Sequence, residues 1–160
     1  MFLNKKIFST VIDSTPLISI DLVIRDHHGE VLLGKRNNRP AQGFWFVPGG
    51  RIYKNEPLAC GFKRLMKSEL GFVLPISDAY YIGLFEHFYE DSVLSKDIST
   101  HYIVNAFEVV LSESQSLSIV KTLPKEQHQA YSWFSDDDLL KNDQVHLHTK
   151  WYFQSDKGFR

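Results

Sequence analysis

Alternating apolar and polar positions predict a β-strand near the start of the chain. Between Pro16 and Asp26, apolar side chains recur at every second position, at Ile18, Ile20, Leu22 and Ile24. This period of two is typical of a strand with one strongly apolar face. Asp21 lies on the opposite face, where a carboxylate is paired, lines a cleft or simply faces solvent.

The following segments predict further strands, turns and short helices. Residues 27–30 read as a turn around Gly29, and residues 31–37 as the second strand of a hairpin. A loop then leads into a short aromatic strand before the paired glycines Gly49 and Gly50. We expect longer strands at 79–90 and 101–111, a polar loop at 91–100, a short strand at 129–135, and short helices at 136–142 and from about Leu147.

A helical period replaces the alternation over residues 57–70. Its apolar positions share one side of the helix: Ala59, Phe62, Met66 and Leu70. Asn55 or Glu56 is expected to cap the start, and Gly71 to end the helix. Strands before, around and after one central helix predict an α/β (α+β) fold, in which a mixed sheet lies between layers of helices.

Composition places the chain among soluble single-domain proteins. Its 160 residues, 43% of them hydrophobic, suffice for one domain spanning 1–160. The net charge of -1 creates no field that would attract nucleic acid or an anionic membrane, so we expect neither partner. The single cysteine, Cys60, excludes an intrachain disulfide and is expected to be buried in the helix. Charged residues interrupt the apolar runs of the N-terminal segment, so we expect no signal peptide and a cytoplasmic location.

A motif with fixed spacing surrounds the central helix. Gly50 is followed after five residues by Glu56, after seven more by Arg64, and then by Glu69 and Gly71. This is the frame of the Nudix box, G-x5-E-x7-R-E-U-x-E-E-x-G-U, in which U is aliphatic. The preceding strand and loop and the glycine that ends the helix are the context that this box requires.

Two positions of the box differ from the common pattern. Leu65 and Ser68 stand where other Nudix pyrophosphatases have metal-binding glutamates. The whole chain resembles the GDP-mannose mannosyl hydrolase family, a Nudix branch whose own box lacks the same two carboxylates. The resemblance includes the segments STPLISIDLVI, GEVLLGKRNNRPAQGFWFVPGGR, EHFYED, THYIV and LPKEQHQAYSWF. It implies the Nudix-type α/β/α sandwich.

A single Mg²⁺ ion per active site is expected. With Glu69 as the one helix carboxylate at a ligand position, a cluster of metals is hard to hold, because Mg²⁺ requires oxygen ligands. Glu69, the backbone carbonyl of Gly49, a neutral oxygen and the substrate diphosphate can hold one ion. The resemblance implies that Gln127 supplies the neutral oxygen. The alternative for Glu69 is a solvated residue near the end of a helix.

Arginines are expected to bind the diphosphate. Guanidinium groups match phosphate oxygens and stay charged. The resemblance assigns this role to Arg36, Arg51 and Arg64, with Tyr102 as a further hydrogen-bond donor. The alternative for Arg64 is that it pairs with Glu56 and supports the loop.

The missing carboxylates weaken attack on phosphorus but not attack at the anomeric carbon of the sugar. That reaction passes through an oxocarbenium-like state, with GDP leaving, and needs a base for the attacking water. The resemblance makes His128 this base and places Asp21 in the active site, beside the sugar or the water. His87 is the rival histidine; it lies near the sugar or is a strand-end histidine bonded to backbone. Attack by one water predicts inversion.

The resemblance also implies a homodimer, whose N-terminal Phe2 and Leu3 contact guanine in the neighbouring site. The leading hypothesis is a Mg²⁺-dependent hydrolase of GDP-mannose, with GDP-glucose as a second candidate substrate. One alternative is a GDP-sugar pyrophosphatase that attacks phosphorus, against which Leu65 and Ser68 argue. Another is a non-catalytic GDP-sugar-binding module.

Overall fold

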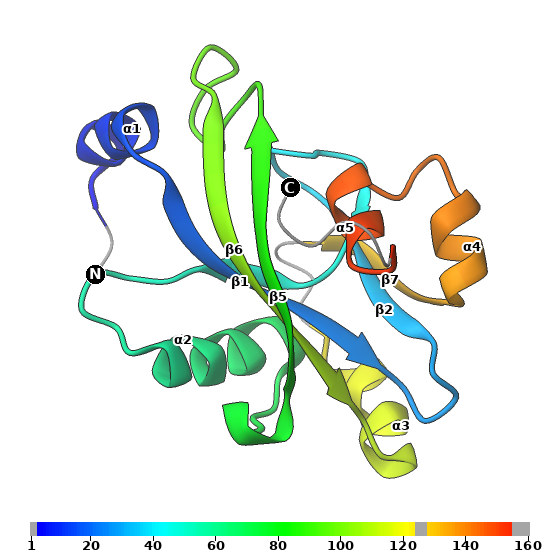
Figure 1. Ribbon diagram of the computed structural model, residues 1–160. Coiled ribbons are helices and arrows are strands. Elements are labelled where there is room, and N and C mark those ends of the chain that lie inside the picture. The colour runs from blue at the N-terminus through cyan, green and yellow to red at the C-terminus, as the bar shows by residue number, and fades with distance from the viewer. Residues whose placement is uncertain (1–2, 124–127, 155–160) are drawn as a thin grey trace.

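A computed structural model describes residues 3–123 and 128–154, which form one mixed sheet with helices on both faces (Figure 1). The strands in this part of the chain are β1 (Leu17–Arg25), β2 (Val31–Arg36), β3 (Trp45–Phe46), β4 (Gly49–Arg51), β5 (Tyr80–Tyr89), β6 (Thr100–Val110) and β7 (His128–Phe134). Their order is β3-β2-β1-β6-β5, while β4 pairs with β1 and β7 with β2. The β1–β6 pair is parallel and the other pairs are antiparallel, so the predicted mixed sheet is confirmed.

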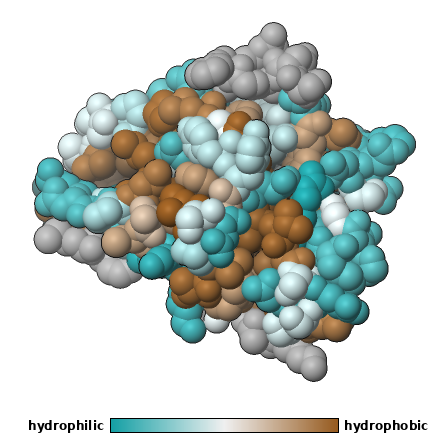
Figure 2. All heavy atoms as spheres, turned by 60° about the horizontal axis from the view of Figure 1, so that its bottom comes forward, coloured by the Kyte–Doolittle hydropathy of each residue, from teal (hydrophilic) through white to brown (hydrophobic). Residues whose placement is uncertain are grey.

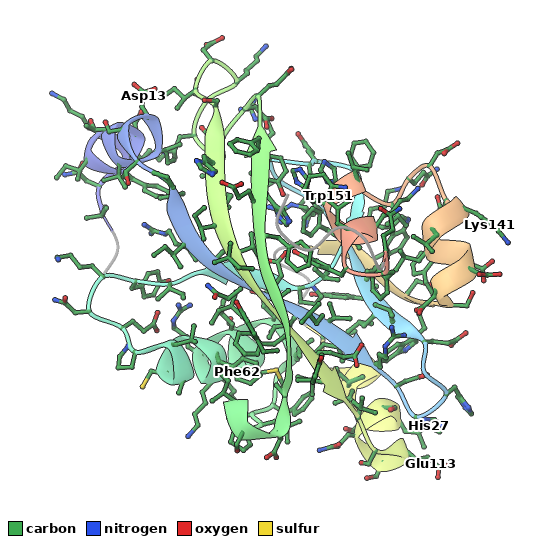
Figure 3. All side chains as sticks on the ribbon, viewed as in Figure 1. Asp13, His27, Phe62, Glu113, Lys141 and Trp151 are labelled. Carbon is green, nitrogen blue, oxygen red and sulfur yellow. The ribbon has the colours of Figure 1, made fainter. Side chains whose placement is uncertain are left out.

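Helices lie on both sides of this sheet. They are α1 (Lys5–Ser14), α2 (Leu58–Leu65), η1 (Met66–Leu70), η2 (Ile76–Asp78), α3 (Glu113–Thr122), α4 (Asp136–Lys141) and α5 (Leu147–Trp151). Figure 3 shows Phe62 of α2 and Trp151 of α5 on opposite sides of the long central strands. The α/β/α arrangement predicted from the sequence is confirmed.

β1 is buried on both faces. Ile20, Leu22 and Ile24 are 0% exposed and pack against α2 in one core cluster. On the opposite face Val23, also 0% exposed, belongs to a second cluster with Val31, Leu33, Phe46, Val47, Leu139 and Val145. The predicted apolar face is therefore correct except at Ile18, which is half exposed. The face that carries Asp21 is covered as well, because α4 and α5 pack on that side.

The start of α2 differs from the prediction. The helix begins at Leu58 after Pro57, and no side chain caps it. Asn55 cannot serve as the cap because it turns the chain with a φ of 65°. Glu56 is occupied elsewhere, since its Oε2 accepts a hydrogen bond from the N–H of Tyr53. Both predicted caps are therefore wrong.

The buried side of the helix was predicted in part. Phe62, Met66 and Leu70 are fully buried, whereas Ala59 and Cys60 are exposed. Those two residues lie in the first turn of α2, and the core cluster includes this helix only from Phe62 onward. The prediction of a buried cysteine was wrong for this reason.

The last turn of the predicted helix is wider than an α-helix. η1 is a π-helix, a form that inserts an extra residue into a turn and recurs at functional sites. Gly71 ends it with a φ of 81°, as expected of a glycine C-cap. Glu69 lies within η1 and is 2% exposed, so the alternative of a solvated residue is wrong.

α1 and α3 were not predicted. Asn4 caps α1 through a 2.9 Å hydrogen bond from the N–H of Ile7, and Ser112 with Gln115 forms a capping box at α3. The cap signals were present in the sequence. α1 also has apolar residues at helical spacing, at Ile7, Phe8, Val11 and Ile12, although only Ile12 is buried, whereas α3 is mostly polar.

The surface carries separate apolar regions. Figure 2 shows hydrophobic surface between hydrophilic regions on the side that faces down in Figure 1. The most exposed large apolar residues include Tyr80, Phe88, Val110 and Leu117. In the described part of the chain, the helices are too short or too polar to cross a membrane.

Candidate active site

A pocket of about 140 Å³ opens on the face of the sheet that carries Asp21. All the strands from β1 to β6 and the loops before β3 and β4 supply its lining. The lining residues are Ser19, Asp21, Arg36, Pro40, Phe46, Val47, Gly49, Gly50, Arg51, His87, Tyr89 and Tyr102. The structure thus brings together five predicted site residues from four different strands: Asp21, Arg36, Gly49, Arg51 and Tyr102.

The pairing of β1 with β4 builds the floor of the pocket. Asp21 pairs with Gly49, and Ser19 with Arg51. The N–H of Leu22 bonds to Pro48 O, and the N–H of Ile52 bonds to Ile18 O. Because hydrogen-bonded and non-hydrogen-bonded pairs alternate along antiparallel strands, the Asp21–Gly49 pair is a non-hydrogen-bonded one, and the Gly49 carbonyl points away from β1.

The two strands approach each other closely at Gly49. A Cβ at this position would lie 2.5 Å from Ile20 O and 2.7 Å from Asp21 Oδ1. The paired glycine of the motif is therefore required here by the approach of β1.

Asp21 is buried in the pocket wall, so the alternative of a charge on a solvent face is wrong. Its Oδ2 accepts a 2.6 Å hydrogen bond from the hydroxyl of Tyr152. Burial raises the pKa of Asp21 to about 6, although the Tyr152 hydrogen bond and the charge of Arg36 both lower it. The carboxylate is thus mostly ionised at neutral pH but holds its proton more tightly than an ordinary aspartate.

Arg36 is the last residue of β2, where the pairing with β7 shifts register after Gly34. Such bulges redirect side chains and recur beside active sites. Its guanidinium carbon lies 5.6 Å from the ring centre of Phe46. Its Nε is buried and has no hydrogen-bond partner among the described residues. A buried, charged donor of this kind is suited to an anion that enters the pocket.

The predicted base, His128, is the strand partner of Arg36. β7 begins at His128, which pairs with Arg36 across the sheet. The structure describes the backbone of His128 and not its side chain. Gln127, the predicted amide ligand, lies outside the described residues, as does Phe2.

Arg51 is held by aromatic rings. Its guanidinium carbon lies 4.2 Å from the ring centre of Phe8 in α1 and 5.5 Å from that of Tyr53. Cation–π contacts favour these placements over free rotation in solvent. α1, which was not predicted, therefore helps to position an arginine of the pocket.

Arg64 is engaged outside the pocket lining. Its Nε and Nη2 each lie 2.7 Å from an oxygen of Glu56, and Nη2 also donates to Arg51 O at 2.9 Å. These hydrogen bonds hold the pKa of Glu56 at about 2, against its partial desolvation. The structure confirms the alternative in which Arg64 pairs with Glu56. Direct contact of Arg64 with a diphosphate stays a prediction.

The residues of the expected metal site offer oxygen ligands of the kind that Mg²⁺ prefers. Glu69 is buried. The pKa of Tyr131 in β7 is raised mainly by the burial of that phenol and secondly by the charge of Glu69, so Glu69 lies near β7. The carbonyl of Gly49 points away from β1. Within residues 3–123 and 128–154, His, Cys, Asp and Glu form no group of three or more suited to a metal. An ion here would therefore depend on backbone, amide and substrate oxygens in addition to Glu69.

Tyr102 and His87 face the pocket from adjacent strands, where they pair across β5 and β6. Burial raises the pKa of Tyr102, so the phenol keeps its proton and can donate it in a hydrogen bond. Burial, together with His148 and His146, lowers the pKa of His87 to about 2. A histidine with so low a pKa is a weak base at neutral pH.

The interpretation of His87 as a strand-end residue bonded to backbone was wrong. It lies within β5, is 2% exposed, and its Nε2 lies 3.2 Å from the hydroxyl of Tyr152. Its ring stacks on that of His148, with centres 4.2 Å apart. Tyr152, which contacts both Asp21 and His87, was not predicted, because no motif surrounds it and 131 residues separate it from Asp21.

Comparison with known proteins agrees with this fold. The family model described as NUDIX domain matches residues 15–154. The low-salt glycan biosynthesis protein Agl8 of Haloferax volcanii is 46% identical over 106 residues, which span 66% of this chain and 66% of that protein. The match thus covers slightly under two thirds of the relative's length.

Solved structures share the fold at low sequence identity. The MutT protein from Methanosarcina mazei Go1 has a TM-score of 0.67 and 23% identity, with 88% of this chain and 92% of that chain covered. The NUDIX domain of Shewanella oneidensis NrtR, complexed with ADP ribose, has a TM-score of 0.57 and 16% identity, with 94% and 97% covered. Because the family model spans most of the sequence and these structures share its fold, the chain belongs to the NUDIX family.

Proposed function

We propose that the protein hydrolyses GDP-mannose, with GDP-glucose as a second candidate substrate, to GDP and the free hexose. Water attacks the anomeric carbon, and the bond from that carbon to the phosphate oxygen breaks with inversion. The relatives support a nucleotide-sugar substrate: one is named for glycan biosynthesis, and another binds ADP ribose. Membership of the NUDIX family supports hydrolysis as the type of reaction.

The distribution of charge in the pocket carries this proposal. Arg36 and Arg51 provide positive charge in the lining, and Asp21, whose pKa the charge of Arg36 lowers, provides a buried carboxylate in the same pocket. A diphosphate needs the first, whereas a sugar that develops positive charge in an oxocarbenium-like state is stabilised by the second. An enzyme that attacks phosphorus has no need of a buried carboxylate beside the sugar.

A residue can be assigned to each step of the proposed reaction. The guanidinium of Arg36 and the phenol of Tyr102 donate to the diphosphate and stabilise the charge that GDP carries as it leaves. Asp21 stabilises the positive charge that develops at the anomeric carbon. His128 accepts a proton from the attacking water, whose oxygen forms the new bond to carbon while the electrons of the broken bond depart with GDP.

Mg²⁺, bound by Glu69, the Gly49 carbonyl and Gln127, would neutralise charge on the diphosphate when present. In this proposal Arg64 supports the site indirectly. Its hydrogen bond to Arg51 O and its pair with Glu56 fix the loop that leads from β4 to α2. The homodimer and the cytoplasmic location implied by the sequence remain predictions, and the mass of the protein in solution would test the first.

Product analysis in water labelled with the heavy oxygen isotope tests the reaction. GDP-mannose is hydrolysed with Mg²⁺, and both products are examined by mass spectrometry. We expect the label in mannose and unlabelled GDP. Label in GMP or in mannose 1-phosphate would overturn the proposal in favour of a pyrophosphatase. Binding of GDP-mannose without any product would favour a binding module.

Replacing Glu69 by glutamine is expected to raise the Mg²⁺ concentration that gives half-maximal turnover by at least about tenfold, since a carboxylate ligand is lost. The measurement is initial rate against Mg²⁺ concentration. Glu113→Gln at the exposed start of α3 is the control, because it removes an equal charge far from the pocket lining. Unchanged Mg²⁺ dependence in the Glu69 variant would show that the ion binds elsewhere.

A further inference from the structure

Tyr152 lies directly after α5, outside the pocket lining, and connects two residues that do face the pocket. Its hydroxyl oxygen is 2.6 Å from Asp21 Oδ2 and 3.2 Å from His87 Nε2. Its ring packs edge-on against Phe85 of β5, with centres 4.8 Å apart. The hydroxyl therefore lies between the side chains of Asp21 on β1 and His87 on β5, behind the residues that line the pocket.

The proton of the hydroxyl determines the direction of both hydrogen bonds. A phenol has one proton to donate, and a separation of 2.6 Å is typical of a hydroxyl that donates to a carboxylate. Burial and the charge of Asp21 raise the pKa of Tyr152, so the phenol keeps this proton. With its proton given to Asp21, the phenol oxygen acts as an acceptor toward His87.

His87 must then be the donor of the second hydrogen bond. Its low pKa leaves the ring neutral, with one proton. That proton lies on Nε2, because Nε2 faces the phenol oxygen. The chain of hydrogen bonds runs from His87 through Tyr152 to Asp21, and Nδ1 of His87 is left without a proton.

We infer that Tyr152 is a positioning residue, which fixes the orientation of the Asp21 carboxylate and the tautomer of His87 at the pocket wall. The inference rests on the proposed function for the role of Asp21, and it adds a residue that the sequence motif does not contain. Without the hydroxyl, one carboxylate oxygen and one ring N–H lose their partner in a buried place. Both side chains can then adopt other arrangements toward the sugar.

The test is Tyr152→Phe, which removes the hydroxyl and keeps the ring against Phe85. The first readout is the nuclear magnetic resonance of the ring nitrogens of isotope-labelled histidine at neutral pH, with His87 assigned by substitution. We expect a protonated Nε2 and a bare Nδ1 in the unmodified protein, and a shifted Nε2 resonance or a mixture of tautomers in the variant. The second readout is steady-state hydrolysis of GDP-mannose.

Turnover in the variant is expected to fall by about 10- to 100-fold while KM changes little, because the substrate still binds but meets a misplaced carboxylate. Tyr80→Phe is the matched control, since Tyr80 is an exposed tyrosine of the same strand as His87. It is expected to change neither readout.

An unaltered Nε2 resonance in Tyr152→Phe would overturn the hydrogen-bond chain. A shifted resonance with unaltered turnover would overturn the positioning role. Failure of the unmodified protein to hydrolyse GDP-mannose would instead count against the proposed function, and the resonance alone would then decide whether Tyr152 holds the two residues.

Discussion

Replacing His128 by glutamine is expected to lower the turnover of GDP-mannose by about 10²- to 10⁴-fold, the range that general base catalysis contributes. Glutamine retains hydrogen-bonding capacity but cannot accept a proton from water. The backbone of His128 pairs with that of Arg36, whose side chain lines the pocket. The measurement is steady-state hydrolysis, with binding of GDP followed separately by calorimetry.

GDP binding is expected to persist in this variant, because the arginines that we propose bind the diphosphate are unchanged. His28→Gln serves as the control, since His28 lies in the exposed turn between β1 and β2. If His128→Gln turns over normally, His128 is not the base. Asp21, whose pKa is raised to about 6, would then be the described pocket residue best suited to accept a proton.

Replacing Gly49 by alanine is expected to destabilise the protein by about 1–3 kcal/mol, as overpacking of a close contact does, and to impair turnover as well. The new Cβ would lie 2.5 Å from Ile20 O and 3.0 Å from Asp21 Cα. Both are backbone atoms, so β4 must move away from β1. Such a movement displaces Arg51 and the Gly49 carbonyl together. Thermal unfolding and steady-state kinetics measure the two effects.

Gly50→Ala is the matched control for Gly49→Ala. Its Cβ would meet Leu65 Cδ2 at 2.8 Å, which is the end of a flexible side chain that can give way. We expect a smaller loss of stability at Gly50. Equal losses at the two glycines would show that the backbone of β1 does not set the requirement.

The sequence predicted those parts of the fold in which local pattern and packing agree. The alternation along β1 identified the strand because Ile20, Leu22 and Ile24 face a core that α2 completes. It did not predict that Val23 and Asp21 are buried too. Helices from the C-terminal part of the chain cover that face. The alternation within β1 cannot predict a contact with residues so far away in the sequence.

The site residues also divide into those that a local motif identifies and those that only distant packing brings to the pocket. Three of the expected residues meet because β1 pairs with β4, and Arg36 and Tyr102 join them in the pocket because β2 and β6 flank β1. Tyr152 was missed because its contact with Asp21 depends on tertiary packing alone. Arg64 illustrates a further limit: the sequence left open whether its guanidinium binds the diphosphate or pairs with Glu56, because a phosphate and an internal carboxylate both accept a bidentate pair.

The π-helical turn at the end of α2 makes the length of this segment as important as its composition. A π-helical turn holds one residue more than an α-helical turn, so losing one residue between Met66 and Leu70 would return this turn to an α-helix while the positions on either side keep their orientation. When sequences of this family are aligned, a single-residue gap inside Met66–Leu70 therefore marks the loss of the wide turn and leaves the flanking positions in register.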